Sequence, residues 1–370
     1  MILLFIFLST CFLAYSNGAN DNFKGVATLF GSGTTNFKRA INWATLTTLS
    51  GSISAIFLAN ELVKNFSGKG LVPNEFIEMP IFAISIAFGA ALTVFIATKV
   101  GMPISTTHGL VGSLFGAGVI AVGSQFNFEK LGSTFLMPLI VSPLMAAVVS
   151  FLAYLVFRLV RKKMGVTKSS CICINEKQSM PKIENANLAL EITSGLELTT
   201  CKNGSTETYD GKLLGISSQQ LLDNLHYLSS GIVSFARGLN DTPKIVGLLL
   251  IFNTLDIKYT MLIIAIIMSV GGLMNSKKVA ITMSEKITPM NSGQGFTANL
   301  VTGLLVTTAS IHGLPVSTTH VSVGSIFGIG TVTKKADYKM IGKIVLSWVL
   351  TLPMAAIVSA LLFKLLETFL

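Results

Sequence analysis

The segment PISTTHGLVGSLFGAG occupies residues 103–118, and a close copy of it, PVSTTHVSVGSIFGIG, occupies residues 315–330. A second pair of phrases precedes these copies: SNGANDNFK ends at Lys24, and ARGLNDTPK ends at Lys244. The order Asn-Asp-x-x-Lys followed by Ser-Thr-Thr-His therefore occurs once in each half, which indicates a duplicated unit. Duplicated polar clusters within otherwise apolar sequence are typical of membrane transporters that bind their substrate near the bilayer midplane.

Composition excludes an ordinary water-soluble domain, because hydrophobic residues make up 51% of the chain and charged residues only 12%. We expect an all-α polytopic membrane protein with about ten spans, some of them broken helices. The apolar runs that predict these spans are 2–16, 40–59, 79–98, 109–123, 134–157, 225–236, 245–270, 296–311, 314–333 and 344–366.

The formal net charge of +10 does not indicate a nucleic-acid partner, because the basic residues gather at the ends of apolar runs. Examples are Lys38-Arg39, Arg158 with 161–163, Lys277-Lys278 and Lys334-Lys335. This is the positive-inside pattern of proteins that cross the lipid bilayer. If these clusters are cytoplasmic, the first span runs from outside to inside and the C terminus lies outside. Each half then has five spans, and an odd number makes the two repeats inverted.

The chain divides into three regions. We predict an N-terminal transmembrane repeat at 1–157, a polar cytoplasmic linker at 158–218 and a C-terminal transmembrane repeat at 219–370. The linker is rich in Lys, Glu, Ser, Thr and Asn, so we expect it to be partly disordered.

Three features receive no functional role. The apolar N terminus lacks a basic n-region and a clear cleavage site, which favours a retained first span over a signal peptide. The cysteines lack a supporting histidine and are interpreted as reduced, incidental thiols rather than a metal site. They are Cys11, Cys171, Cys173 and Cys201. Two further histidines, His226 and His312, have no counterpart in the other half.

Asp21 follows a largely apolar stretch, and an ionisable side chain at membrane depth is costly and usually functional. Helical spacing would place Asn20 and Lys24 on the face that carries Asp21. The alternative is a surface loop in which Lys24 snorkels and Asp21 caps a helix. The same arrangement recurs at Asn240, Asp241 and Lys244. This recurrence favours a site inside the membrane.

The two Ser-Thr-Thr phrases are predicted to start helices inside the membrane, because each follows a proline and offers good capping residues. A helix that begins there presents unpaired N–H groups and the positive end of its dipole, so each phrase can form an anion-binding cradle. The cradle hydroxyls belong to Ser105, Thr106, Thr107, Ser317, Thr318 and Thr319. We expect the following glycines to serve helix packing. His108 and His320 are expected to fix the local turn rather than to carry a proton or contact substrate.

With these phrases the chain resembles the inorganic phosphate transporter (PiT) family, whose members carry Gly-Ala-Asn-Asp and Pro-x-Ser-Thr-Thr-His phrases in each half. The resemblance spans both halves. It implies a secondary active transporter that imports inorganic phosphate by alternating access. The absence of an Arg-rich amphipathic presequence favours the plasma membrane over an organelle. The coupling cation is Na⁺ or H⁺, and no other cofactor is implied. Candidate Na⁺ ligands are Asn20, Asp21, Asn240 and Asp241.

The implied assembly is a homodimer in the lipid bilayer, and the implied activity is transport rather than catalysis.

The chain departs from the commonest family pattern at one paired position, where Lys24 and Lys244 replace an asparagine that many members carry. An amide oxygen can ligate Na⁺, whereas an ammonium group has no lone pair and carries a positive charge itself. We hypothesise that the two lysines either contact phosphate or take the place of a bound sodium ion.

Three other functions remain open from the residues alone. Hydroxyl cradles suit any tetrahedral oxyanion, so a sulfate permease is the main alternative. Hydrogen phosphate can donate a hydrogen bond to Asp21 or Asp241 through its P–OH group, which sulfate cannot do at neutral pH, and this difference favours phosphate. An intramembrane enzyme with Ser105 and His108 lacks a third catalytic member. An anion channel would differ from a transporter because anions would cross it passively, without uphill accumulation.

Overall fold

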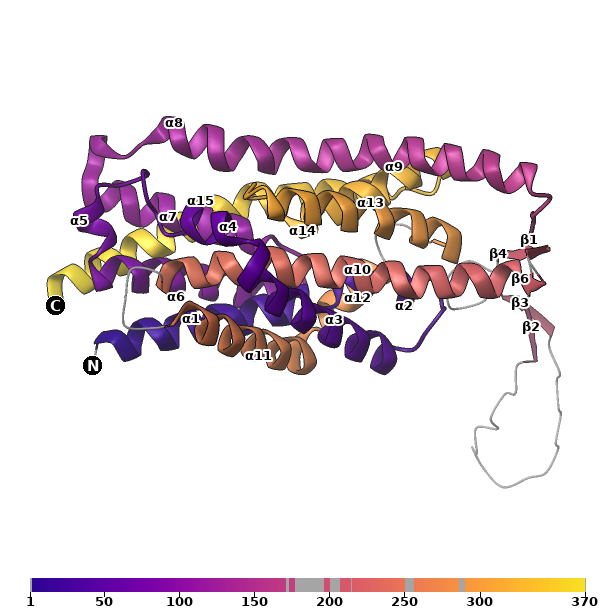
Figure 1. Ribbon diagram of the computed structural model, residues 1–370, viewed down its shortest axis with the longest axis horizontal. Coiled ribbons are helices and arrows are strands. Elements are labelled where there is room, and N and C mark those ends of the chain that lie inside the picture. The colour runs from indigo at the N-terminus through magenta and orange to yellow at the C-terminus, as the bar shows by residue number, and fades with distance from the viewer. Residues whose placement is uncertain are drawn as a thin grey trace, which may run out of the picture.

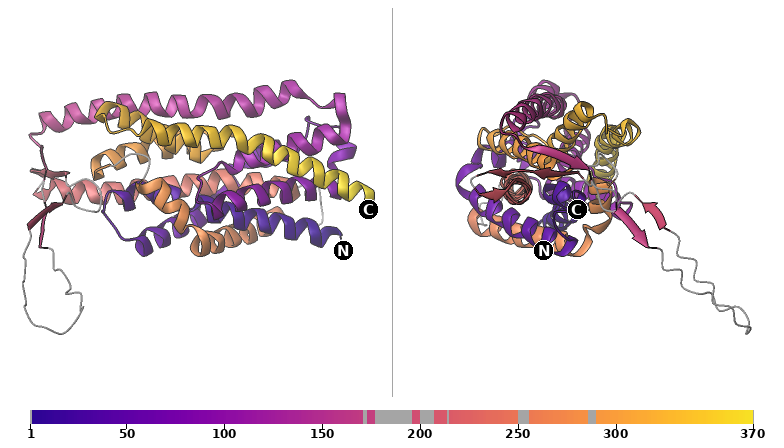
Figure 2. Two further views of the ribbon diagram at one scale, coloured as in Figure 1. Left: turned by 180° about the vertical axis from the view of Figure 1, so that it is seen from behind. Right: turned by 90° about the vertical axis from the view of Figure 1, so that its right-hand side faces the viewer.

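The computed structural model describes residues 2–170, 173–176, 196–199, 207–213, 215–249, 256–285 and 290–369. This part of the chain is mainly helical, and its long helices run roughly along the longest axis of the molecule (Figure 1). The N and C termini lie at one end of the molecule, and the strands between the two halves lie at the opposite end (Figures 1 and 2).

The first half contains the helices α1 (Ile2–Asp21), η1 (Lys24–Val26), α2 (Ala27–Gly31), α3 (Phe37–Leu58), α4 (Asn60–Asn65), α5 (Asn74–Ile77), α6 (Pro80–Lys99), α7 (Thr106–Val122), η2 (Gly123–Gln125), α8 (Phe128–Lys130), η3 (Leu131–Leu136) and α9 (Met137–Lys163). The second half contains α10 (Ser218–Val246), η4 (Gly247–Leu249), α11 (Ile257–Asn275), α12 (Lys277–Glu285), α13 (Ser292–Ile311), α14 (Thr318–Thr333) and α15 (Tyr338–Phe369).

Three small antiparallel sheets lie between the halves, in the region predicted as a polar linker. They pair β1 (Thr167–Ser170) with β4 (Glu207–Asp210), β2 (Cys173–Glu176) with β3 (Leu196–Thr199), and β5 (Lys212–Leu213) with β6 (Ile216–Ser217). Helix α9 extends to Lys163, beyond the predicted start of the linker. Cys171 and Cys201 lie outside the described residues.

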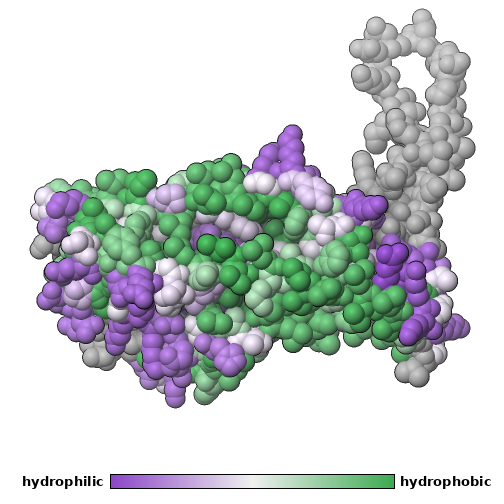
Figure 3. Space-filling model, turned by 90° about the horizontal axis from the view of Figure 1, so that it is seen from above, coloured by the Kyte–Doolittle hydropathy of each residue, from purple (hydrophilic) through white to green (hydrophobic). Residues whose placement is uncertain are grey.

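Each predicted apolar run overlaps one of these helices. Seven helical segments of the described chain are long and apolar enough to cross a membrane: Ile2–Gly31, Phe37–Leu58, Pro80–Lys99, Thr106–Gln125, Phe128–Lys163, Ile257–Asn275 and Tyr338–Phe369. Hydrophobic residues cover most of the face in Figure 3, and many hydrophilic residues lie toward its two ends. Large apolar side chains such as Leu144 and Leu361 are exposed on α9 and α15. These features belong to a multi-pass membrane protein.

The helices of the two halves interlock. Helix α1 packs on α6 of its own half and on α11 of the other half, whereas α10 packs on α13 of its own half and on α3 of the other. The largest cluster of buried hydrophobic side chains lies among α1, α6, α7 and α11, and it includes Leu13, Phe82 and Met268. Helix α7 likewise packs on α15, and α14 packs on α9.

Glycines allow these crossings to be close. A Cβ atom on Gly18 of α1 would lie 1.9 Å from the carbonyl oxygen of Met268 on α11. A Cβ atom on Gly238 of α10 would lie 2.1 Å from the carbonyl oxygen of Thr48 on α3. Gly18 and Gly238 occupy the same place in the two Asn-Asp phrases. Matching positions of the two halves therefore make matching contacts.

The glycines that follow the Ser-Thr-Thr phrases act in the same way. A Cβ atom on Gly116 of α7 would lie 2.0 Å from the carbonyl oxygen of Ala356 on α15, and one on Gly328 of α14 would lie 2.1 Å from the carbonyl oxygen of Ala147 on α9. The predicted packing role of these two glycines is confirmed. Because α7 and α14 are held this closely, their N-terminal turns are fixed in the interior of the bundle.

Candidate functional site

The two Ser-Thr-Thr phrases form the first turns of α7 and α14. The N-cap hydroxyl of Ser105 accepts a hydrogen bond of 3.2 Å from the backbone N–H of His108, and Ser317 accepts one of 3.3 Å from His320. Both serines have extended backbone conformations, as N-cap residues do. The predicted helix starts are therefore confirmed.

All twelve predicted site residues are buried. They are Asn20, Asp21, Lys24, Ser105, Thr106, Thr107, Asn240, Asp241, Lys244, Ser317, Thr318 and Thr319. The alternative that Lys24 snorkels from a surface loop is wrong, because Lys24 is 2% exposed. Helix α1 ends at Asp21, and Lys24 begins the short helix η1. The second phrase differs, because α10 continues through Asp241 and Lys244.

Lys24 links the two halves of the chain. Its Nζ atom donates to a carboxylate oxygen of Asp21, to the carbonyl oxygen of Ile104 at 2.6 Å and to Oγ1 of Thr319 at 2.7 Å. Ile104 directly precedes the first cradle, and Thr319 belongs to the second. An ammonium group from the first Asn-Asp phrase therefore contacts both cradle regions.

Lys244 makes the corresponding contacts from the other side. Its Nζ atom donates to the carbonyl oxygen of Val316 at 2.6 Å and to Oγ1 of Thr107 at 2.9 Å, and it lies 3.6 Å from Oδ1 of Asp241. Val316 and Thr107 are the repeat counterparts of Ile104 and Thr319. Each lysine thus contacts the same three kinds of oxygen: carboxylate, carbonyl and hydroxyl.

The two aspartates converge on one amide group. Nδ2 of Asn17 lies 3.3 Å from Oδ2 of Asp21, 3.2 Å from Oδ2 of Asp241 and 3.1 Å from Oγ1 of Thr106. Oγ1 of Thr106 also donates to Oδ2 of Asp21 at 3.2 Å. Carboxylates from the two halves therefore meet in the interior, next to the first cradle.

The two asparagines of the Asn-Asp phrases flank this centre. Nδ2 of Asn20 donates to Oγ1 of Thr98 at 2.9 Å and to the carbonyl oxygen of Met102 at 3.0 Å. Nδ2 of Asn240 contacts Oγ1 of Thr318 at 3.2 Å. Oδ1 of Asn240 accepts a hydrogen bond from Ser310, whereas Oδ1 of Asn20 has no partner among the described residues. The oxygen of Asn20 is therefore a buried acceptor that a ligand could use.

Sequence reasoning missed two residues of the site, Asn17 and Arg237. The guanidinium of Arg237 is fully buried and donates to Oδ1 of Asn17 at 2.6 Å and to Oδ1 of Asn22 at 2.9 Å. Its Nε atom lies 3.6 Å from Oδ2 of Asp241. Asn17 and Arg237 stand four residues before Asp21 and Asp241, at matching places in the two phrases. That shared spacing was the signal that could have identified them.

The centre carries more basic than acidic side chains. Lys24, Lys244 and Arg237 oppose Asp21 and Asp241, and all five side chains are buried. Their formal charges leave one positive charge in a region from which water is excluded. Such a centre attracts an anion. Without the three basic side chains, burial of both Asp21 and Asp241 as carboxylates would be far more costly.

The cradle histidines face away from the carboxylates. Nδ1 of His108 lies 3.0 Å from the carbonyl oxygen of Trp348 on α15, and Nδ1 of His320 lies 3.1 Å from the carbonyl oxygen of Leu139 on α9. The two rings meet edge to face at 4.4 Å, and His320 stacks on Trp348 at 3.8 Å. These contacts hold the first turns of α7 and α14 against the long helices beside them, as expected for a packing role.

Comparison with known proteins gives consistent results over the whole chain. The model of the phosphate transporter family matches residues 17–359. A candidate phosphate permease of Haemophilus influenzae is 27% identical, with 96% of this chain and 94% of the relative covered. The inorganic phosphate transporter 2-1, chloroplastic, of Arabidopsis thaliana is 25% identical, with 93% and 69% covered.

A solved structure titled the sodium-dependent phosphate transporter has the same fold, with a TM-score of 0.78, 24% identity and 100% of both chains covered. The family match extends across both Asn-Asp phrases and both cradles. The chain is therefore a multi-pass membrane protein that belongs to the phosphate transporter family, whose members are transporters and not enzymes.

Proposed function

We propose that this protein imports inorganic phosphate across the plasma membrane by alternating access, coupled to a gradient of Na⁺ or H⁺. The observation that carries the proposal is the meeting of both Asn-Asp phrases and both cradles at one buried, positively charged centre. A single amide nitrogen, Nδ2 of Asn17, lies within hydrogen-bond distance of Asp21, Asp241 and Thr106. The family and the names of the relatives support phosphate as the substrate.

We propose about ten spans arranged as two inverted repeats of five. The termini at one end and the linker strands at the other end support an odd number of crossings in each half (Figure 1). The matching contacts of Gly18 and Gly238 across the two halves support a two-fold relationship between the repeats. The basic cluster at the end of α9 lies beside the linker strands, which supports a cytoplasmic linker.

In the proposed cycle, phosphate binds between the cradles, and the two interlocked bundles rock to expose the site to one side and then the other. The N-terminal turns of α7 and α14 supply N–H groups and hydroxyls to phosphate oxygens. Lys24 and Lys244 supply positive charge from opposite sides. Asp21 or Asp241 accepts a hydrogen bond from the P–OH group, which selects phosphate over sulfate.

Sulfate import is the second candidate, because the positive centre and the hydroxyls suit any tetrahedral oxyanion. Competition separates the two substrates. Excess unlabelled sulfate should leave uptake of labelled phosphate unchanged, whereas competition as strong as that of unlabelled phosphate would favour the sulfate function.

Uptake by proteoliposomes tests the proposed function. The purified protein should accumulate labelled phosphate above its external concentration when a cation gradient is imposed. Asp21→Asn should reduce this uptake, and Glu61→Gln should not, because Glu61 is exposed and pairs with the exposed Lys64. Equilibration without accumulation would indicate a channel instead. We also propose that the protein is a homodimer, which light scattering on the purified protein in detergent can test.

A further inference from the structure

Each buried lysine lies in a cage of oxygen atoms. Lys24 is surrounded by a carboxylate oxygen of Asp21, the Ile104 carbonyl and the Thr319 hydroxyl. Lys244 has the equivalent set from the opposite halves, with the Val316 carbonyl and the Thr107 hydroxyl. Carboxylate, carbonyl and hydroxyl oxygens are the ligands that hard cations prefer. Each ammonium group therefore occupies the kind of place in which a small cation would bind.

We propose that Lys24 and Lys244 are built-in cations that replace bound Na⁺ at the substrate site, so that this protein transports phosphate without sodium. The inference rests on the proposed phosphate function and specifies its coupling. A bound sodium ion enters and leaves the site with each cycle, whereas a lysine keeps its positive charge inside the site throughout.

The balance of charge supports this role. With both lysines, three buried basic groups oppose two carboxylates, and the centre has a formal charge of +1. If both lysines were asparagines, Arg237 alone would oppose Asp21 and Asp241, and the centre would be negative. A phosphate anion would then need mobile cations beside it, because like charges repel strongly where water is excluded.

The geometry also places the two charges where the substrate is expected. Each lysine bonds a hydroxyl of the opposite cradle, Lys24 at Thr319 and Lys244 at Thr107. Asp21, Asp241 and Arg237 are the other charged groups that face this centre. Phosphate oxygens bound at the two helix starts would therefore contact positive charge from both halves.

The first test uses the wild-type protein in proteoliposomes, with a fixed inward proton gradient and with Na⁺ either present or replaced by choline. We expect the same initial rate of phosphate uptake in both solutions. Uptake that requires Na⁺ would overturn this inference while leaving the phosphate function intact. Failure to take up phosphate in either solution would instead contradict the proposed function.

The second test uses the double variant K24N/K244N, with phosphate binding measured by calorimetry. In choline, loss of the buried charges should weaken binding by about 30-fold or more, and added Na⁺ should restore it. The matched control K24R/K244R keeps both charges and should bind phosphate without Na⁺. A folded K24N/K244N protein that binds phosphate equally well with and without Na⁺ would contradict the proposal. If this variant does not fold, the wild-type measurement still decides.

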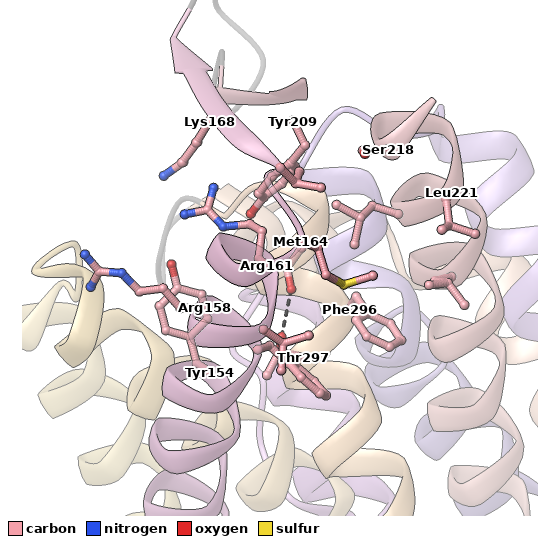
Figure 4. A pocket seen from close by; sticks show the side chains of 16 residues that line it. Tyr154, Arg158, Arg161, Met164, Lys168, Tyr209, Ser218, Leu221, Phe296 and Thr297 are labelled. Atoms are coloured by element: carbon pink, nitrogen blue, oxygen red, sulfur yellow. Dashed lines mark hydrogen bonds between the residues drawn. The ribbon is translucent and has the colours of Figure 1, made fainter. Parts of the chain in front are cut away.

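A separate cavity of about 260 Å³ lies near the linker end of the molecule, lined by residues of α9, α10 and α13 and by Tyr209 of β4 (Figure 4). The charged ends of Arg158, Arg161 and Lys168 lie on one side of it, and Leu221 and Phe296 lie on the other. The cavity therefore has one basic wall and one apolar wall. It lies at the C-terminal end of α9, whose outer face is hydrophobic.

Arg161 gives this cavity a second distinguishing feature. Its Nη1 atom is buried and has no hydrogen-bond partner among the described residues. Its guanidinium lies over the ring of Tyr209, 5.5 Å from the centroid. The ring is fixed, because the Tyr209 hydroxyl donates to Oδ1 of Asn291 at 2.9 Å. The guanidinium is thus held in place with a donor still available for an anionic group.

From these observations we infer a binding site for one anionic phospholipid. Its headgroup phosphate would contact Arg158 and Arg161, and an acyl chain would lie against the apolar wall. Basic pockets between membrane helices on the cytoplasmic side are suited to anionic lipid headgroups. Neither the cradles nor the aspartates line this cavity, so the lipid site is independent of the phosphate site.

Native mass spectrometry of the purified protein tests the lipid site. Phosphatidylglycerol should remain bound to the wild type, and phosphatidylcholine should not. R158Q/R161Q should lose phosphatidylglycerol, whereas K38Q/R39Q should retain it, because this control removes the same charge from exposed positions. Equal retention of both lipids by the wild type, equal loss in both variants, or displacement by inorganic phosphate would each overturn the assignment.

Discussion

The ammonium group of Lys24 lies 2.7 Å from the hydroxyl oxygen of Thr319, which belongs to the other half of the chain. The equivalent bond, from Lys244 to Thr107, measures 2.9 Å and runs in the opposite direction. Each cradle is therefore held partly by a lysine of the opposite repeat. The two halves therefore meet in one buried centre, and each supplies a lysine and a threonine to it.

The crossed bonds predict a matched effect of Thr107→Val and Thr319→Val. Valine keeps the shape of threonine but removes the oxygen, so a buried ammonium loses an acceptor. A hydrogen bond to a charged group contributes about 1.5–3 kcal/mol, so we expect the KM for phosphate to rise by about tenfold or more in each variant. Thr→Ser at the same positions keeps the hydroxyl and serves as the control. Valine variants with the wild-type KM in proteoliposome uptake would contradict the crossed arrangement.

The helix crossings predict that Gly18→Ala destabilises the protein. The added Cβ would lie 1.9 Å from the Met268 carbonyl oxygen, so α1 and α11 would have to separate. Overpacking of this kind typically costs about 1–3 kcal/mol. Gly342→Ala on α15 is the control, because a Cβ there meets nothing within 4 Å. Thermal unfolding in detergent should show a lower midpoint for the first variant alone. Equal midpoints would show that the crossing can relax.

The sequence predicted the duplication, the helix starts at the cradles and the burial of Asp21, because these depend on local spacing and on the cost of burying charge. It did not predict which helices of the two halves pack together, since the hydrophobicity of a helix does not specify the helix on which it packs. For the same reason, the shared contact of Asn17 with Asp21 and Asp241 was not foreseen. The strands of the linker were also missed, because their polar composition resembles that of disordered segments.

Arg237 illustrates a signal that was present and not used. It lies four residues before Asp241 and directly after the apolar run 225–236, where an unpaired charge would be costly. The structure shows why it is tolerated there, because Asn17, Asn22 and Asp241 surround its guanidinium. The shared spacing from the aspartate marks the position in both halves, but the charge is not repeated, since the matching residue is the neutral Asn17.

This environment predicts that Arg237→Met is severely destabilising. The change leaves the oxygens of Asn17 and Asn22 without their donor and removes a positive charge beside Asp241. Breaking a buried charged pair typically costs about 3–5 kcal/mol. Arg237→Lys keeps the charge and should retain part of the stability and uptake. Thermal unfolding in detergent measures the difference, and a methionine variant as stable as the wild type would show that Arg237 does not hold the centre together.

The histidines provide the opposite case, in which a titratable group close to the site is expected not to take part in transport. His108 and His320 bond the carbonyl oxygens of Trp348 and Leu139, so their Nδ1 atoms point toward α15 and α9. In H108N/H320N, the asparagine amides can replace the Nδ1 donors, and we expect phosphate uptake with the same dependence on pH as the wild type. His320→Ala removes both the bond and the stacking on Trp348, so its unfolding midpoint should fall. A shifted pH profile in H108N/H320N would instead assign the coupling proton to these rings.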